Sequence, residues 1–308
     1  MRNLQVTLAA LLVWGGLSAA LLAVVPLNRA MPFLLLGLCL VPVAVFLGAR
    51  SRKPKPVAPP PVSPRAQVPP EALTEENLRR VFGEENVARA WAPWMGEGPV
   101  PAQALEKLGG APAFVEPVEW PRCRHCGQRL TFLAQLAVGP ERPLRYPEEG
   151  VLYVFLCQRI DPGQEISICP SLELESGAER CFVQRLPGAR PVALTLDDSG
   201  PRLSPERAVE GWESHPSVRL PSEADWTPEQ SRLYAAVCEP FGVQVGGMPD
   251  WVQSEETPGP CACGAERELV LEFGQFTEDL NLGMGRAYVF ACCARHAPEA
   301  FWLLWQAS

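Results

Sequence analysis

The chain has 308 residues, of which 47% are hydrophobic, and its formal net charge is −8. Residues 1–70 contain seven of the 27 basic residues and none of the 35 acidic residues, which leaves the remainder with a net charge of −15. This acidic excess argues against nucleic acid as a partner, because a phosphate backbone needs clustered Lys and Arg. It suits an unknown protein partner of basic character.

The first 50 residues predict a membrane anchor. Two uncharged runs, Asn3–Asn28 and Ala30–Ala49, are each long enough for a membrane-spanning helix of about 20 residues. Basic residues crowd the exit of the second run, which favours a cytoplasmic position for both ends. We therefore expect a two-helix transmembrane hairpin over residues 1–50 in the cell inner (plasma) membrane, with a cytoplasmic body. A single anchor and a cleaved signal peptide are the alternatives.

A proline-rich linker follows over residues 51–70, with eight prolines in 20 positions. Such a composition favours an extended, semi-rigid spacer. Thr74 is then a candidate helix N-cap, with Leu78 and Phe82 at helical spacing. Trp91 continues this apolar spacing after Gly83, so one or two short helices are expected before the first cysteine motif.

One stretch of the body occurs twice. Gly109-Gly110 and Gly246-Gly247 each precede a proline, an aromatic residue and a group of cysteines. In both copies 17 positions separate the second glycine of the pair from the glycine after the cysteines, Gly127 or Gly264. A match at fixed spacing indicates internal duplication.

We expect an α+β fold that is mainly β, built from two related halves. The first half, residues 71–220, includes the N-terminal helices and apolar runs typical of strands near residues 130–136 and 151–156. Residues 197–221 have the composition of an exposed connector. The second half covers residues 221–308 and begins with a helix at Thr227, whose capping box is completed three residues later.

The first copy contains a zinc-knuckle motif, Cys123-x-x-Cys126-Gly127. Two thiolates at this spacing can hold one face of a tetrahedral zinc ion. Cys157 at the end of a predicted strand and Cys169 are expected to complete the site, with Cys181 as the alternative fourth ligand.

The second copy offers a less regular set, in which one residue separates Cys261 from Cys263. Cys292 is the positional match of Cys157, and His296 follows it. These four residues form a reasonable zinc site, and a copy that has lost its metal is the alternative. Because each set contains enough ligands to close the coordination shell, we expect one or two structural zinc ions.

Catalytic motifs are scarce. The chain has three histidines, and neither a zinc-protease helix motif nor a phosphate-binding glycine loop is present. We therefore expect a non-catalytic protein-binding module, with a hydrolase using a cleft between the halves as the alternative. The second glycine loop is the expected partner surface. Its residues are Gly246, Gly247, Pro249, Asp250, Trp251 and Gln253.

The order of these motifs resembles the bacterial YwqG-like domain of unknown function. The residues that carry the resemblance are the Gly-Gly-x-Pro-Asp-Trp-x-Gln loop from Gly246 to Gln253 and the Tyr-x-Phe-x-Cys pattern ending at Cys292, followed by His296. The resemblance covers residues 105–308, and it departs at the shortened Cys261/Cys263 spacing. A more distant resemblance to the programmed cell death protein two family implies a chaperone-like role toward a basic ribosomal protein.

Overall fold

The computed structural model describes residues 68–160, 169, 177–186, 194–219, 226–237, 242–294 and 300–307. Its helices are η2 (Pro70–Leu73), α3 (Glu75–Phe82), η3 (Glu84–Asn86) and α4 (Pro228–Val237). Its strands are β1 (Val87–Met95), β2 (Lys107–Leu108), β3 (Ala113–Phe114), β4 (Thr131–Val138), β5 (Gly150–Leu156), β6 (Glu179–Arg185), β7 (Thr195–Leu196), β8 (Arg207–Val218), β9 (Val243–Gly246), β10 (Arg267–Phe273), β11 (Arg286–Cys292) and β12 (Phe301–Gln306).

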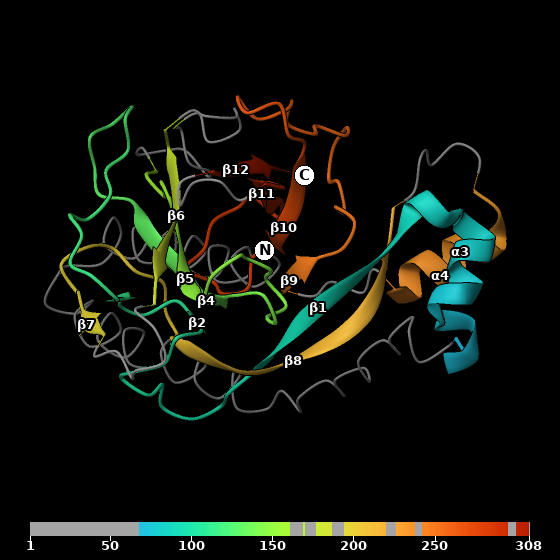
Figure 1. Cartoon of the computed structure of the whole chain (residues 1–308), viewed down its shortest axis with the longest axis horizontal. Coiled ribbons are helices and arrows are strands. Elements are labelled where there is room, and N and C mark those ends of the chain that lie inside the picture. Colours follow the sequence, from blue (N-terminus) through green and yellow to red (C-terminus); the bar gives the residue numbers. More distant parts are fainter. Residues whose placement is uncertain are drawn as a thin grey trace, which may run out of the picture. The chain divides into compact units, whose positions relative to one another are not determined.

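In the described residues, ten strands form one sheet in the order β12-β11-β10-β9-β1-β8-β2-β4-β5-β6. Neighbouring strands are antiparallel, and β1 and β8 make the longest pair, from Val87 opposite Val218 to Met95 opposite Val209. Figure 1 shows this pair as a long curved ribbon with α3 and α4 beside one of its ends. The two terminal strands, β12 and β6, also approach each other, so the sheet nearly closes on itself.

The strand order is symmetric about the β1–β8 pair. On one side lie β9, β10, β11 and β12, and on the other lie β2, β4, β5 and β6. A Gly-Gly pair ends β9 and follows β2, a cysteine motif precedes β10 and β4, and a cysteine ends β11 and follows β5. Each of the four strands on one side of this pair therefore has a counterpart on the other side.

Successive side chains of the strands face opposite sides of the sheet, and this divides the core into an inner part and two outer parts. In β5, Leu152 and Val154 face the shared inner core, whereas Tyr153 and Phe155 face an outer core that includes Cys123. The same alternation in β11 places Tyr288 in a separate outer core. Successive side chains of a strand point to opposite faces, so these buried strands have apolar residues on both.

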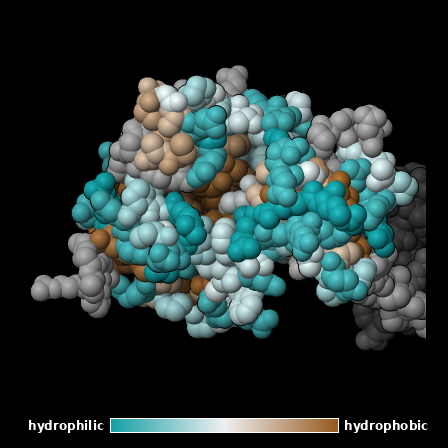
Figure 2. Space-filling view, turned by 45° about the vertical axis from the view of Figure 1, so that its right-hand side comes forward, coloured by the Kyte–Doolittle hydropathy of each residue, from teal (hydrophilic) through white to brown (hydrophobic). Residues whose placement is uncertain are grey.

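The two helices form their own small core against the β1–β8 ribbon. Leu78 and Phe82 of α3 pack with Leu233 and Val237 of α4. The predicted helix start at Thr227 is confirmed: its amide donates to Gln230 Oε1 at 2.9 Å, and the Gln230 amide donates to the Thr227 hydroxyl at 3.2 Å. Figure 2 shows a largely hydrophilic face, with hydrophobic side chains mainly in its hollows.

Two local predictions are wrong. The apolar spacing after Gly83 predicts a helix, but residues 87–95 form β1, because Gly83 ends α3 with φ +94° and the chain then pairs with β8. Residues 207–218, expected within an exposed connector, form β8. Its mixed pattern of charged and apolar residues hides a strand that is stabilised by long-range pairing with β1.

The fold and membrane predictions also need correction. The described residues form a mostly β structure with two α-helices, where an α+β fold that is mainly β and follows a two-helix transmembrane hairpin was expected. Among these residues, no helix has the length and apolar character needed to cross a bilayer. The expected hairpin at residues 1–50 lies outside the described residues, as does the linker up to residue 67. The transmembrane hairpin, the membrane as a partner and the inner-membrane location are therefore not supported.

Candidate metal centres

The first cysteine motif folds into a tight turn. The Cys123 amide donates to the Gln128 carbonyl at 2.9 Å, and the Gly127 amide donates back to the Cys123 carbonyl at 2.9 Å. Gly127 has φ +71°, a left-handed conformation that glycine adopts without strain. This turn directs the two thiols of the motif toward the end of β5.

Four thiols meet at this turn. The sulfur atoms of Cys123, Cys126, Cys157 and Cys169 all lie within 4.8 Å of one another. The Cys123–Cys169 and Cys126–Cys157 sulfur pairs are each 3.8 Å apart. A disulfide would need about 2.05 Å, whereas two sulfurs bound to one tetrahedral zinc at about 2.3 Å lie about 3.8 Å apart. The spacing therefore fits a four-thiolate zinc site.

The ligands come from distant parts of the chain. Cys157 directly follows β5, where its amide donates to the Ala178 carbonyl at 2.7 Å. Cys169 belongs to the connection between β5 and β6. Cys181, the alternative fourth ligand, lies on β6 with its side chain in the inner core, where burial raises the pKa of its thiol. The structure thus brings Cys169, and not Cys181, to the other three thiols.

The thiols of the first cluster differ in acidity. Burial raises the pKa of Cys157 far above its ordinary value, and it raises the pKa of Cys169 to about 11. Burial also acts on Cys126, but a backbone hydrogen bond at Gln128 and bonds from the neighbouring thiols outweigh it and lower that pKa to about 7. Several buried thiolates can coexist here only with a cation between them, which is the arrangement that a metal ion provides.

The second cysteine motif makes a similar turn with one residue fewer. The Cys261 amide donates to the Ala265 carbonyl at 2.8 Å, and the Gly264 amide donates to the Cys261 carbonyl at 2.7 Å. The sulfur atoms of Cys261, Cys263 and Cys292 lie within 4.8 Å of one another, with Cys263 and Cys292 3.5 Å apart. This cluster could hold a metal ion through three thiols.

Cys292 occupies the position that Cys157 has in the first half. Its amide donates to the Ala300 carbonyl at 3.1 Å, just as the Cys157 amide donates to Ala178. The second cluster is more open, since Cys263 is exposed and Cys261 is half-buried. The expected fourth ligand, His296, lies outside the described residues.

The predicted partner loop is held by internal contacts. Gly246 and Gly247 have φ +65° and +82°, and they line a cavity of about 280 Å³ together with Trp91. Trp251 packs against the ring of Tyr288, with centroids 4.7 Å apart. Gln253 donates from Nε2 to the Ala307 carbonyl at 2.7 Å. Pro249 lies between the glycine pair and these anchored residues.

A partly buried ionic group beside this loop, centred on Glu272, was missed by the sequence analysis. Arg286 contacts Glu272 at 2.6 Å and Asp250 at 3.0 Å, and the Tyr234 hydroxyl donates to Asp250 at 2.6 Å. Burial raises the pKa of Glu272 to about 7, although Arg286 acts in the opposite direction. The repeat contained a signal for this group. When the two halves are aligned by sequence, Glu272 matches Gln135, so this strand position is polar in both halves.

Fold and site together define a class of mostly β proteins that contain cysteine clusters able to hold metal ions. The chain belongs to a family described as a domain of unknown function, DUF1963, whose family model matches residues 106–290. It is also similar to the uncharacterized protein YpfL of Salmonella typhimurium, with 39% identity over 70 residues. This match covers 20% of the chain and 16% of that relative, so the chain spans only a small part of YpfL's length.

Proposed function

We propose that the protein is a non-catalytic binding module braced by structural zinc at its cysteine clusters. The observation that carries this proposal is the set of four thiols at residues 123, 126, 157 and 169, whose sulfur atoms lie within 4.8 Å of one another. A zinc ion with four protein ligands has no open position for a substrate, which is typical of structural sites. The ion would tie the cysteine turn to the end of β5 and to the β5–β6 connection.

The two carboxyl groups whose pKa values are raised support a binding role more than a catalytic one. Burial raises the pKa of Glu106, but its Oε1 accepts a hydrogen bond from Trp212 Nε1 at 3.1 Å. Glu272, whose pKa is also raised, contacts Arg286 and accepts from the Asp250 amide. Both carboxylates are thus used in internal contacts that hold strands and loops together.

A hydrolase-type enzyme is the second candidate. The observation in its favour is a cavity of about 610 Å³ whose walls come from both halves of the sequence. Pockets of this size bind small molecules in many proteins. Neither Glu106 nor Glu272 lines this cavity. Cys181 does line it, but burial raises the pKa of its thiol, which keeps the thiol protonated and makes it a poor nucleophile.

The loop from Gly246 to Gln253 is a proposed partner surface. Its support is the cavity beside Gly246 and Gly247, where a partner could approach bare backbone. Asp250 and Trp251 would act mainly by holding the loop in place through Arg286 and Tyr288. A YwqG-like identity and a chaperone-like role, both implied by the motif resemblance, belong to this proposal too.

Chelation tests the structural role of the metal. Thermal unfolding of the zinc-loaded protein should shift downward by 10 °C or more after treatment with a strong chelator, and zinc should restore it. The zinc-loaded protein should not hydrolyse phosphate esters, carboxylic esters or peptides. Turnover that disappears in Cys126→Ser while the fold is retained would show a catalytic metal and overturn the proposal.

A further inference from the structure

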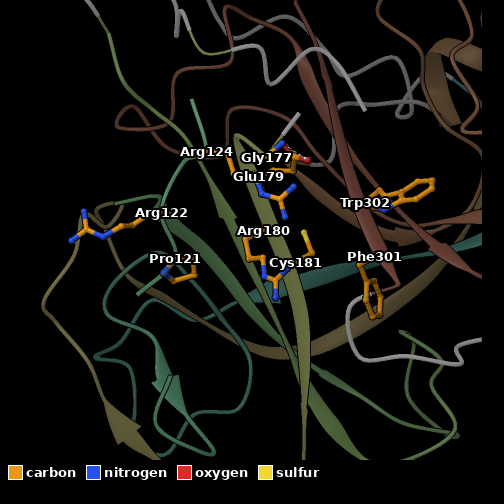
Figure 3. Close-up of a pocket in the computed structure, with 9 residues that line it drawn as sticks. All are labelled: Pro121, Arg122, Arg124, Gly177, Glu179, Arg180, Cys181, Phe301 and Trp302. Carbon is orange, nitrogen blue, oxygen red and sulfur yellow. Dashed lines mark hydrogen bonds between the residues drawn. The ribbon is translucent and has the colours of Figure 1, made fainter. Parts of the chain in front are cut away.

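The cavity of about 610 Å³ lies where the nearly closed sheet has no hydrogen-bonded pairing between its terminal strands. Its walls come from the first cysteine motif, from β6 and from β12. β6 and β12 are the two ends of the ten-stranded sheet. Figure 3 shows Arg124, Glu179 and Arg180 on the β6 side, with Phe301 and Trp302 of β12 across from them.

The described residues that line this cavity carry a net charge opposite to that of the whole protein. Arg124 and Arg180 contribute two guanidinium groups, and Glu179 contributes one carboxylate. The chain as a whole has a net charge of −8. Arg122 also lines the cavity, but it donates from Nη1 to the Gly127 carbonyl at 3.0 Å and its side chain extends away from the other labelled residues in Figure 3. The other two cationic residues of the lining are Arg124 and Arg180.

The backbone fixes the position of Arg124. Its amide donates to the Gly177 carbonyl at 2.9 Å. Gly177 has φ +76°, and a Cβ atom at this position would collide with the Arg124 side chain. Glycine is therefore required at residue 177 both by the backbone conformation and by the close passage of Arg124. The Gly177 amide also donates to Glu179 Oε1 at 3.4 Å, which anchors the carboxylate on the same wall.

The opposite wall adds positive charge behind an aromatic ring. The Arg267 guanidinium stacks over the ring of Trp302. The Arg267 guanidinium occupies the face of the Trp302 ring that a cationic ligand would use. Its positive charge therefore favours a negatively charged ligand in the cavity. Guanidinium groups bind carboxylates and phosphates through paired hydrogen bonds, which matches the groups on the β6 side.

We propose that this cavity binds a ligand through carboxylate or phosphate oxygens held by Arg124 and Arg180. Free phosphate compounds and the acidic side chains of a peptide are two sources of this chemistry. The inference deepens the proposed binding function, since metal at Cys123 and Cys126 would hold the turn that carries Arg124. The ligand proposed for the cavity is negatively charged, whereas the partner that the acidic composition suggests is basic.

Calorimetric titration of the full zinc-loaded chain tests the proposal with two probes, inorganic pyrophosphate and a hexaglutamate peptide. A hexalysine peptide is the charge control. At least one anionic probe should bind saturably, Arg124→Gln and Arg180→Gln should each weaken it at least tenfold, and added salt should weaken it further. Arg142→Gln, which removes a surface arginine paired with Glu149 at 3.4 Å, should leave binding unchanged.

If only pyrophosphate binds, the result supports a free phosphate compound as the ligand of the cavity. If hexaglutamate binds in competition with pyrophosphate, the result supports an acidic peptide as the ligand. Failure of both probes to bind, or binding unaffected by Arg124→Gln and Arg180→Gln, overturns the proposal. Zinc content measured on the same samples separates the two proposals. Retained zinc without anion binding would contradict the cavity proposal alone, and arginine-dependent binding by a zinc-free chain would contradict the metal brace alone.

Discussion

Gln135 and Glu272 occupy matching positions in the two halves and make the same contact. Gln135 Oε1 accepts a hydrogen bond from the Ala113 amide at 2.8 Å, and Glu272 Oε2 accepts one from the Asp250 amide at 3.1 Å. Each is paired across the sheet with a tyrosine, Tyr153 or Tyr288. The first half therefore holds its aromatic loop with a neutral amide, whereas the second half uses a buried carboxylate.

This difference predicts a pH dependence that Glu272→Gln should remove. Burial raises the pKa of Glu272 from 4.5 to about 7, so between these values the folded state holds a proton that the unfolded state has released. The stabilising contribution is therefore complete below pH 4.5 and is lost as the pH rises through 7. This change corresponds to about 3 kcal/mol at most.

Urea unfolding of the wild type and Glu272→Gln between pH 4.5 and 8 measures this effect. The wild type should lose stability relative to Glu272→Gln as the pH rises through this range. Comparing the two proteins cancels the pH dependence of metal binding, which they share. A difference in unfolding free energy that stays constant, or that grows in favour of the wild type, would mean that Arg286 keeps Glu272 ionised throughout.

The two tyrosines should not contribute equally to stability. The Tyr288 hydroxyl donates to the Asp250 carbonyl at 2.8 Å and accepts from the Val252 amide at 3.1 Å. The Val115 amide, which donates to the Tyr153 hydroxyl, also donates to Gln184 at 2.9 Å and keeps that partner after mutation. Tyr288→Phe should cost about 2–3 kcal/mol and Tyr153→Phe about 1 kcal/mol in urea unfolding. An equal or larger loss in Tyr153→Phe would argue against this explanation.

The half-buried ion pair between Lys107 and Glu206 should contribute more to stability than a surface pair. Lys107 Nζ lies 2.6 Å from Glu206 Oε1, and the Lys107 side chain is only 3% exposed. Glu206→Gln leaves this buried ammonium group without its carboxylate. Because Glu206 itself is 35% exposed and solvent screens the pair, the loss of stability should be about 1–2 kcal/mol. Glu148→Gln, in a surface pair with Arg185, should change the unfolding free energy by less than about 0.5 kcal/mol. Similar effects from both variants would show that the burial of Lys107 gives this ion pair no special role.

Gly247 should tolerate no side chain. It has φ +82°, and a Cβ atom there would lie 2.8 Å from the Cβ atoms of Ala90 and Ser217. Gly247→Ala should therefore destabilise the protein by about 2 kcal/mol or more. Gly259→Ala is the matched control, because a Cβ atom at that position meets no other atom within 4 Å. Thermal unfolding of the two variants measures the difference, and a neutral Gly247→Ala would contradict the described loop conformation.

Local chemistry explains what the sequence could predict. The turn at Cys123 depends on two cysteines and a glycine within a few residues, and the capping box at Thr227 depends on residues three apart. Strand β5 is apolar on both faces, so its composition is distinctive. Grouping Cys157 and Cys169 with the cysteine turn followed from the number of ligands that zinc needs.

The central ribbon could not be predicted in the same way. β1 contains Pro93 and β8 contains several exposed charged residues, and each is stabilised by pairing with the other across more than 100 positions of sequence. The ionic contacts of Asp250 with Arg286 were hidden for a related reason. An acidic residue in a loop suggests contact with solvent, and only the fold brings an arginine from β11 to within 3.0 Å.

The most direct test of the metal-braced account is the metal content of the purified full chain, measured by native mass spectrometry. The account predicts up to two bound zinc ions, with one lost in Cys126→Ser and retained in Cys181→Ser, whose thiol lies outside the cluster. Cys126→Ser should also lower the unfolding temperature. A wild-type chain that binds no metal when purified with zinc, or that joins Cys123 and Cys169 in a disulfide, would contradict the account.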